Sequence, residues 1–272
     1  MKTLNLNENT TIPILGLGTW KLTGTECVEM VSKALEIGYR HIDTADAYGN
    51  HREISRAIKE SRVPREELFI TSKLWRTNMH ARDVIEAGKR TLDELGIEYL
   101  DLFLIHWPNR SVPIAETLEA MNTLKEEGLV KALGVSNFTI NHLKDAFETE
   151  VEITNNQIEF HPSLNQRELK DFCDSNGITV TGYSPFARGE DLDIPQLQEI
   201  TESHETTVPQ VILSWLMQKN IIAIPKASSE KHLQDNFASL KWELSPEELA
   251  TIDAINHEPN RTVSPLWADF EY

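Results

Sequence analysis

Asp43 and Tyr48 are the first residues in the chain whose types and spacing could carry out acid/base chemistry. Asp43 ends a short apolar stretch, and Tyr48 follows in a segment that we expect to be a loop. A carboxylate beside a phenol can move a proton. The structural alternative stays open at this point, because Asp often forms turns and Tyr often packs with its hydroxyl group satisfied.

Lys73 and His106 occupy similar places, each at the end of an apolar stretch. A phenol has a pKa of about 10, so it donates a proton poorly at neutral pH unless a nearby cation stabilises the phenolate. We expect Lys73 to supply that charge and Asp43 to orient Lys73. His106 could donate a hydrogen bond to a substrate oxygen or relay a proton. A solvated lysine and a turn-capping histidine are the structural alternatives.

Alternating strands and helices would bring these four residues together. Residues 4–6 and 11–14 flank a turn-prone segment and predict an N-terminal β-hairpin. Amphipathic helices then separate eight segments that are typical of buried strands, namely residues 14–18, 40–44, 68–72, 99–105, 130–135, 153–158, 178–183 and 221–224. This alternation favours an α/β fold of parallel βαβ units, and a closed (β/α)8 TIM barrel is the simplest answer. The carboxyl ends of all strands in such a barrel face one mouth.

A doubly wound open sheet is the competing fold. Its dinucleotide-binding fingerprint needs a third glycine in register after an early strand. Here Gly16 and Gly18 are followed by Thr19-Trp20-Lys21, which contains none. We therefore predict a single barrel domain over residues 1–272, preceded by the hairpin.

The charge balance disfavours several classes of function. Acidic residues number 43 and basic residues 26, and the net charge of −17 opposes attraction to nucleic acid or to an anionic membrane. Cys27 and Cys173 fall at apolar helix positions, and the histidines are scattered singly, so we expect no disulfide and no metal site. No segment approaches the roughly 20 apolar residues of a membrane span. We expect a cytoplasmic protein.

Short motifs throughout the chain resemble those of the aldo-keto reductase family, in the family's order. They are Gly16-Leu17-Gly18-Thr19-Trp20, Asp43-Thr44-Ala45, Tyr48-Gly49-Asn50, Ser72-Lys73-Leu74-Trp75, Leu104-Ile105-His106-Trp107-Pro108, Gly134-Val135-Ser136-Asn137-Phe138, Asn156-Gln157-Ile158-Glu159, Gly182-Tyr183-Ser184-Pro185 and Ile224-Pro225-Lys226. The resemblance implies a monomeric barrel that binds NADPH and transfers hydride to a carbonyl carbon. It also implies a catalytic tetrad with Tyr48 as proton donor, formed by Asp43, Tyr48, Lys73 and His106.

The same resemblance implies where the nicotinamide end of the cofactor binds. Ser136, Asn137 and Gln157 match the groups that hydrogen-bond the carboxamide, and Tyr183 matches the aromatic residue that stacks on the ring. Simple packing at a strand end is the alternative for Tyr183. Ser184 and the loop to Arg188 would lie along the pyrophosphate.

Lys226 matches the lysine that meets the adenosine 2′-phosphate. The sequence departs from the family beside it, with Ala227 where Ser is common and His232 where an Arg is usual. A missing guanidinium removes a bidentate phosphate partner, so use of NADH is possible beside the favoured NADPH. Other polar groups that could meet phosphate or adenine are Ser229, Asp235 and Asn236. A further departure is His51 in place of the usual Glu, for which the sequence suggests no role.

Trp20, Trp75 and Trp107 follow three of the strands and would wall a pocket for small or apolar carbonyl substrates. Aromatic packing within loops is the alternative for each. The short loop after His106 and the short tail of residues 260–272 resemble prokaryotic members that reduce 2,5-diketo-D-gluconate, methylglyoxal and other aldehydes. We predict NADPH-dependent reduction of a broad range of small aldehydes and ketones.

Three alternative functions remain open. The chain could be a 2,5-diketo-D-gluconate reductase, or a non-enzymatic NADPH-binding barrel with a regulatory or structural role, although the intact tetrad disfavours the latter. A metal-dependent barrel hydrolase is also disfavoured, because the chain has no His-x-His pair and Lys73 would repel a metal ion.

Overall fold

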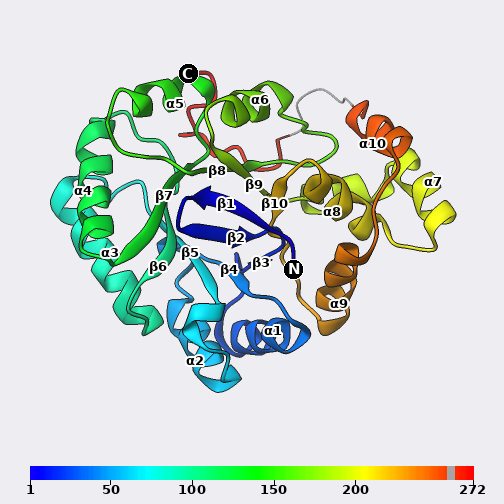
Figure 1. Ribbon diagram of the computed structural model, residues 1–272, viewed down its shortest axis with the longest axis horizontal. Coiled ribbons are helices and arrows are strands. Elements are labelled where there is room, and N and C mark those ends of the chain that lie inside the picture. Colours follow the sequence, from blue (N-terminus) through cyan, green and yellow to red (C-terminus); the bar gives the residue numbers. More distant parts are fainter. Residues whose placement is uncertain (256–260) are drawn as a thin grey trace.

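Eight parallel strands form the centre of the computed structural model, which describes residues 1–255 and 261–272. Each strand pairs with the next one in the sequence. A parallel bridge between Leu15 and Ala223 joins the first strand to the last and closes the sheet into a barrel (Figure 1). The strands are β3 (Leu17–Gly18), β4 (His41–Asp43), β5 (Phe69–Leu74), β6 (Leu100–Ile105), β7 (Val130–Ser136), β8 (Asn155–Glu159), β9 (Thr179–Tyr183) and β10 (Ile221–Ala223). The predicted (β/α)8 barrel is confirmed.

Helices form a ring outside the strands (Figure 1). Two of them, α7 and α8, follow one another in the sequence between β9 and β10. The alternation of one helix with one strand is therefore broken there. None of the described helices combines the length and the apolar character that crossing a membrane requires. The helices are α1 (Gly24–Ile37), α2 (His51–Ser61), α3 (Ala81–Leu95), α4 (Ile114–Glu126), α5 (Ile140–Phe147), α6 (Arg167–Ser175), α7 (Pro195–His204), α8 (Val208–Gln218), α9 (Glu230–Ala238) and α10 (Pro246–Asp253).

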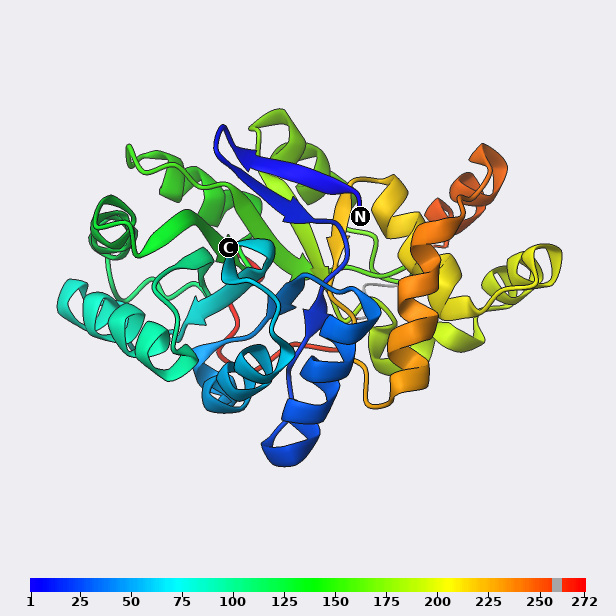
Figure 2. The same ribbon diagram turned by 60° about the horizontal axis from the view of Figure 1, so that its bottom comes forward.

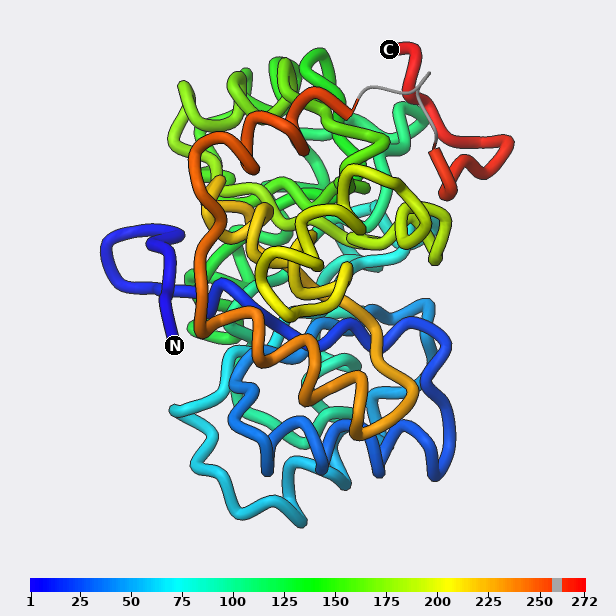
Figure 3. The backbone as a smooth tube through the Cα atoms, turned by 90° about the vertical axis from the view of Figure 1, so that its right-hand side faces the viewer, coloured from blue at the N-terminus to red at the C-terminus, as the bar shows by residue number. Residues whose placement is uncertain are grey.

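The predicted N-terminal hairpin is confirmed as β1 (Thr3–Asn7) and β2 (Thr10–Pro13). Its buried side chains Leu6 and Ile12 pack against residues of the barrel interior, namely Phe69, Leu102, Leu104, Ala132, Ile222 and Ile224. The hairpin therefore plugs one end of the barrel. The tail after residue 260 lies on the opposite side of the molecule (Figures 2 and 3). Residue 260 itself, where the predicted tail begins, is outside the described residues.

Each predicted strand differs from the observed one by at least one residue at an end, and the first and sixth strands show the largest shifts of their starting residue. The first strand was expected over residues 14–18 but narrows to β3, with Leu15 forming only the closing bridge. The sixth was expected over residues 153–158 but begins at Asn155, because both the backbone N–H and the hydroxyl group of Thr154 donate to the Leu133 carbonyl. Polar Asn155, Asn156 and Gln157 are buried within this strand.

Candidate active site

The four ionisable residues of the predicted tetrad meet at the carboxyl ends of neighbouring strands. Asp43 ends β4, Lys73 lies near the end of β5, and His106 follows β6 directly. Tyr48 ends a short 3-10 helix, η1 (Asp46–Tyr48), after β4. Asp43, Tyr48 and His106 line a cavity of about 620 Å³, and fully buried Lys73 lies behind it.

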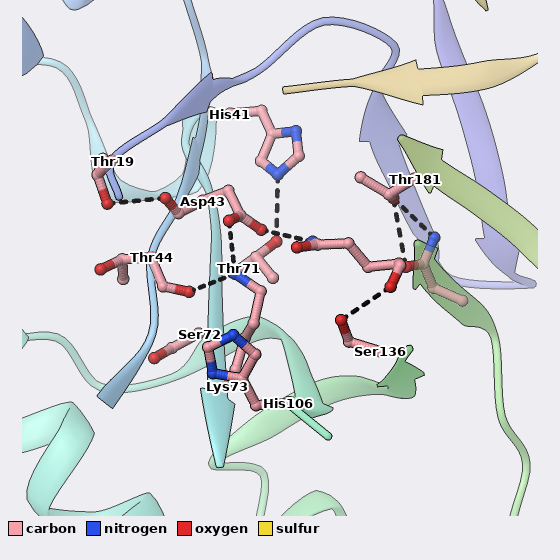
Figure 4. A network of polar contacts seen from close by, with 12 residues as sticks. Thr19, His41, Asp43, Thr44, Thr71, Ser72, Lys73, His106, Ser136 and Thr181 are labelled. Carbon is pink, nitrogen blue, oxygen red and sulfur yellow. Dashed lines mark hydrogen bonds and ion pairs between the residues drawn. The ribbon is translucent and has the colours of Figure 1, made fainter. Parts of the chain in front are cut away.

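Lys73 and Asp43 form a buried ion pair. Lys73 Nζ lies 2.5 Å from Asp43 Oδ1 and donates a second hydrogen bond of 2.8 Å to the Thr44 carbonyl (Figure 4). Gln157 Nε2 donates to the other carboxylate oxygen at 2.7 Å. Burial raises the pKa of Asp43 and lowers the pKa of Lys73, and the attraction between the two charges opposes both shifts. The pair holds Lys73 in one position under the cavity.

Tyr48 lies beside this pair. Lys73 Nζ is 5.2 Å from the centroid of its ring, and the His106 ring packs edge-on at 5.7 Å. Burial and the negative charge of Asp43 raise the pKa of Tyr48, contrary to the expectation that Lys73 would lower it. Burial is the larger cause of this shift, and the charge of Asp43 adds to it. The raised pKa keeps the Tyr48 hydroxyl group protonated. This group forms no hydrogen bond with the described part of the chain and is therefore available to a ligand in the cavity.

The His106 ring is neutral and available. Burial and the charge of Lys73 hold its pKa well below the ordinary value. Its Nδ1 has no hydrogen-bond partner among the residues that the structure describes. Its backbone carbonyl accepts a 2.9 Å hydrogen bond from Asn137 Nδ2, and the Trp75 ring packs edge-on at 5.3 Å. These contacts fix the backbone and the plane of the ring while leaving its nitrogens without a hydrogen-bond partner among the described residues.

A polar network lines the cavity on the side of β7, β8 and β9. Ser136 Oγ donates to the Gln157 carbonyl at 2.8 Å. Asn137 adopts a left-handed backbone conformation with φ of 63°, and its Oδ1 accepts from the Tyr183 hydroxyl group at 2.7 Å. All four residues predicted to meet the nicotinamide end therefore lie together in the cavity wall. Burial raises the pKa of Tyr183 well above the ordinary value, so this side chain is a neutral aromatic wall.

Ser184 and Arg188, which the family resemblance places along the pyrophosphate, both line the same cavity. Both have left-handed φ values, 48° and 56°, which mark a tightly turned segment. The Arg188 guanidinium lies 5.0 Å from the Trp20 ring, and Lys21 Nζ lies 4.5 Å from the same ring. Two cations therefore lie close to Trp20, which also lines the cavity.

The residues predicted to meet the adenosine end of the cofactor do not all line the cavity. Lys226 lines the cavity, is exposed, and forms no salt bridge with the described residues. Ser229 caps α9 by accepting from the backbone N–H of exposed His232 at 3.2 Å. The Asp235 carboxylate instead accepts hydrogen bonds from α8, and Asn236 is buried. Of these residues, Lys226 is the one that reaches the cavity.

The tail supplies part of the pocket that sequence reasoning missed. Val263 lines the cavity, and Trp267 packs edge-on against Trp75 at 5.8 Å and against Trp107 at 5.0 Å. The three tryptophans predicted to wall the substrate pocket, Trp20, Trp75 and Trp107, all line the cavity. No periodicity or motif marks Val263, because it lies in an irregular segment far from the strand that it contacts.

His51, for which the sequence suggested no role, is a structural bridge. Its Nδ1 lies 3.0 Å from Glu94 Oε2 on α3, and its Nε2 lies 3.1 Å from Ser72 Oγ on β5. The ring is buried on α2 and outside the cavity. It therefore joins two helices to the strand that carries Lys73.

Comparisons with known proteins agree with this geometry. The sequence profile of the Aldo/keto reductase family matches residues 14–257. Glyoxal reductase of Bacillus subtilis (strain 168) is 40% identical over 258 residues, covering 94% of this chain and 93% of that protein. The 9,11-endoperoxide prostaglandin H2 reductase of Trypanosoma cruzi (strain CL Brener) is 38% identical over 260 residues, covering 94% of this chain and 92% of that protein.

Solved structures show the same likeness. An aldo-keto reductase from a Medee basin deep-sea metagenome library superposes with a TM-score of 0.92 at 37% identity, covering 98% of both chains. The Bombyx mori aldo-keto reductase in complex with NADP superposes with a TM-score of 0.91 at 31% identity, covering 100% of this chain and 99% of that one. The chain therefore belongs to the aldo/keto reductase family and is an oxidoreductase.

Proposed function

We propose that this protein reduces small aldehydes and ketones to alcohols with NADPH, and that Tyr48 is the proton donor. One observation carries the proposal. The Tyr48 hydroxyl group and the His106 ring, neither bonded to the described protein atoms, border the same end of one cavity, beside the buried pair of Lys73 and Asp43. Two neighbouring polar side chains without a protein partner for these groups are suited to bind a carbonyl oxygen.

The residues of the chain account for the movement of the proton. A carbonyl oxygen gains negative charge during reduction, and NADPH, when bound, supplies the hydride. Neutral His106 donates a hydrogen bond that orients the oxygen, and Tyr48 transfers its proton to it. The phenolate that remains lies close to Lys73, whose positive charge stabilises it. Asp43 keeps Lys73 in place and is a positioning residue.

The cavity wall fits a nicotinamide cofactor. Gln157 Oε1 accepts no hydrogen bond from the described residues, and Asn137 Oδ1 has capacity beyond its bond to Tyr183, so both can accept from a carboxamide. The Tyr183 ring offers a flat, uncharged surface for the nicotinamide. Lys226 places a positive charge in the wall of a strongly acidic protein, where it would bind the 2′-phosphate.

The substrate class follows from the opposite wall. Trp20, Trp75 and Trp107 give it an apolar, aromatic surface, which favours small carbonyl compounds with little charge. The similarity to a glyoxal reductase supports α-keto aldehydes such as methylglyoxal among the substrates. We expect a broad range, because aromatic side chains form most of this wall and apolar contacts discriminate weakly between small substrates.

The test is NADPH consumption with methylglyoxal and with a nitrobenzaldehyde by the wild type and by Tyr48→Phe. General acid catalysis contributes on the order of 100- to 10,000-fold, so kcat of Tyr48→Phe should fall by about that factor. NADPH binding, followed by quenching of tryptophan fluorescence, should be retained. Tyr99→Phe is the matched control, because Tyr99 lies outside the cavity, against Arg65 and Lys131.

Two outcomes would contradict the proposal. Turnover by Tyr48→Phe equal to that of the wild type would exclude Tyr48 as the proton donor. NADPH binding by a wild-type protein that reduces no carbonyl compound in a broad panel would favour the non-enzymatic barrel instead.

A further inference from the structure

A buried cluster of ionisable groups lies outside the tetrad, at the carboxyl end of β8. It consists of Glu159, His161 and Asp191, which are 0%, 0% and 1% exposed. His161 Nε2 lies 3.3 Å from Glu159 Oε1, and His161 Nδ1 lies 3.2 Å from Asp191 Oδ2. The proton transfer described above uses none of these groups. Ionisable groups are rarely buried so completely unless they are paired and hydrogen-bonded.

Glu159 holds the C-terminal tail. Its Oε1 accepts hydrogen bonds from the Thr262 backbone N–H at 2.9 Å and from the Thr262 hydroxyl group at 2.6 Å. Its Oε2 accepts from the Val263 backbone N–H at 3.2 Å. Both oxygens of one carboxylate therefore bind consecutive residues of a segment that has no regular secondary structure.

A second connection joins the same two segments. Gln166 Nε2 donates to the Glu159 carbonyl at 2.6 Å, and Arg261 donates to Gln166 Oε1 at 2.8 Å. Residues 261–263 are thus fixed to the end of β8 through both the backbone and the side chain of Glu159. This is the point at which the tail reaches the cavity, because Val263 lines it.

Beyond this point the tail passes to the other side of the mouth. Trp267 packs against Trp75 and Trp107, and Arg110 pairs with Asp269 at 2.6 Å. The tail therefore has one attachment at β8 and another near the ends of β5 and β6. The wall that it adds to the cavity depends on both attachments.

The charge of Glu159 suits this task. Although burial opposes the shift, hydrogen bonds from His161 and Thr262 lower the pKa of Glu159 below its ordinary value. The side chain is therefore a carboxylate, which accepts hydrogen bonds from backbone N–H groups more strongly than a neutral amide does. A Gln side chain in its place would present an NH2 group to a backbone donor and leave that donor unsatisfied.

We propose that Glu159 is a positioning residue that fixes the tail over the mouth and so completes the wall against which the substituent of the carbonyl substrate binds. This inference rests on the proposed function. Glu159 touches neither the reacting carbonyl nor its proton donor, so it acts on substrate binding and leaves the proton transfer unchanged. We expect a bulky substituent to reach Val263 in the cavity wall and a small one not to.

The test compares Glu159→Gln with the wild type. Loss of a charge-assisted hydrogen bond changes an equilibrium constant by roughly tenfold or more. KM for a nitrobenzaldehyde should therefore rise by about tenfold. KM for methylglyoxal should rise less, and kcat for both should stay within about twofold. Independently of activity, hydrogen exchange at the Thr262 and Val263 amides should become about tenfold faster. Trypsin should also cut after Arg261 more readily.

Two further variants make the result decisive. Thr262→Val removes one donor to Glu159 and keeps the carboxylate, so a smaller change in the same direction is expected even if Glu159→Gln folds poorly. Asp101→Asn is the matched control, because Asp101 is a buried strand carboxylate that accepts from the Ile70 backbone N–H and lies outside the cavity. It should leave both KM values and tail exchange unchanged.

The failure of this inference differs from the failure of the proposed function. A wild-type protein that reduces no carbonyl compound would refute the function, and exchange and proteolysis would still test the attachment of the tail. Unchanged amide exchange in Glu159→Gln would overturn the inference whatever the activity. So would faster exchange with an unchanged KM for the nitrobenzaldehyde.

Discussion

Lys73 Nζ lies 2.5 Å from Asp43 Oδ1, although the two residues are 30 positions apart in the sequence and both side chains are buried. They meet because β4 and β5 are parallel neighbours whose carboxyl ends point to the same mouth. Gln157 and the Thr44 carbonyl complete the hydrogen bonds of the pair. The pair is therefore part of the barrel core as well as of the active site.

Breaking this pair on one side should destabilise the fold. Lys73→Met leaves the Asp43 charge buried without its partner, which typically costs about 3–5 kcal/mol. The double variant Lys73→Met/Asp43→Asn removes both charges and should be more stable than Lys73→Met alone. Urea unfolding of the wild type, both single variants and the double variant gives the free energies of unfolding.

A surface pair provides the control for this cycle. Lys125→Met removes a lysine that contacts Glu152 at 2.8 Å in a partly exposed position, where water screens the charges. It should change stability little. If Lys73→Met were as stable as Lys125→Met, the pair would not stabilise the barrel core.

The sequence was sufficient to predict the barrel and the four strand-end residues, because apolar strands of a parallel sheet end abruptly in polar residues. It could not predict the pKa of Tyr48, which depends on burial and on Asp43 more than on the neighbouring Lys73. The attachment of Thr262 to Glu159 was also inaccessible, since it spans 103 positions and follows no periodicity. The contacts of Asp235 with α8 depend in the same way on how two helices pack.

His106 should remain neutral throughout the physiological pH range. Burial and Lys73 hold its pKa well below the ordinary value of 6.5, so protonation requires a correspondingly lower pH. Ring NMR signals of the nine histidines, with His106 assigned by its loss in His106→Gln, would measure this directly. We expect the His106 signal not to move between about pH 6 and about pH 8. A midpoint near the ordinary value would show that the ring is not shielded from water and from Lys73 as the structure indicates.

Lys226 should discriminate between the two nicotinamide cofactors. Lys226→Ala removes the cation proposed to meet the 2′-phosphate, so Kd for NADPH should rise by about tenfold while Kd for NADH changes little. Quenching of tryptophan fluorescence reports both values. Lys89→Ala is the control, because Lys89 pairs with Glu127 on the surface and lies outside the cavity.

The outcome for NADH decides the interpretation. An equal loss of affinity for both cofactors would place Lys226 against a group that they share, such as the pyrophosphate. Equal affinity of the wild type for both cofactors would mean that neither Lys226 nor its neighbours select the 2′-phosphate, a result that the presence of Ala227 and His232 makes worth measuring.

Stability should depend on pH through the cluster of Glu159, His161 and Asp191. Although burial opposes it, hydrogen bonds to Asp191 and Glu159 raise the pKa of His161 above the ordinary value of 6.5. A raised pKa in the folded state means that His161 contributes its full stabilisation below that ordinary value and loses it as pH rises through the folded pKa. The pKa values of Glu159 and Asp191 are lowered, so their contribution is lost only as pH falls through those lower values.

Melting temperatures of the wild type and His161→Gln between about pH 5 and about pH 9 would test this sign. Gln keeps hydrogen-bonding capacity but carries no charge at any pH. The wild type should exceed the variant most at the acidic end of this range, and the difference should shrink as the pH rises, because neutral His161 and Gln then face the two carboxylates alike. A difference that stayed constant with pH would show that folding does not shift the pKa of His161, which would contradict the raised pKa.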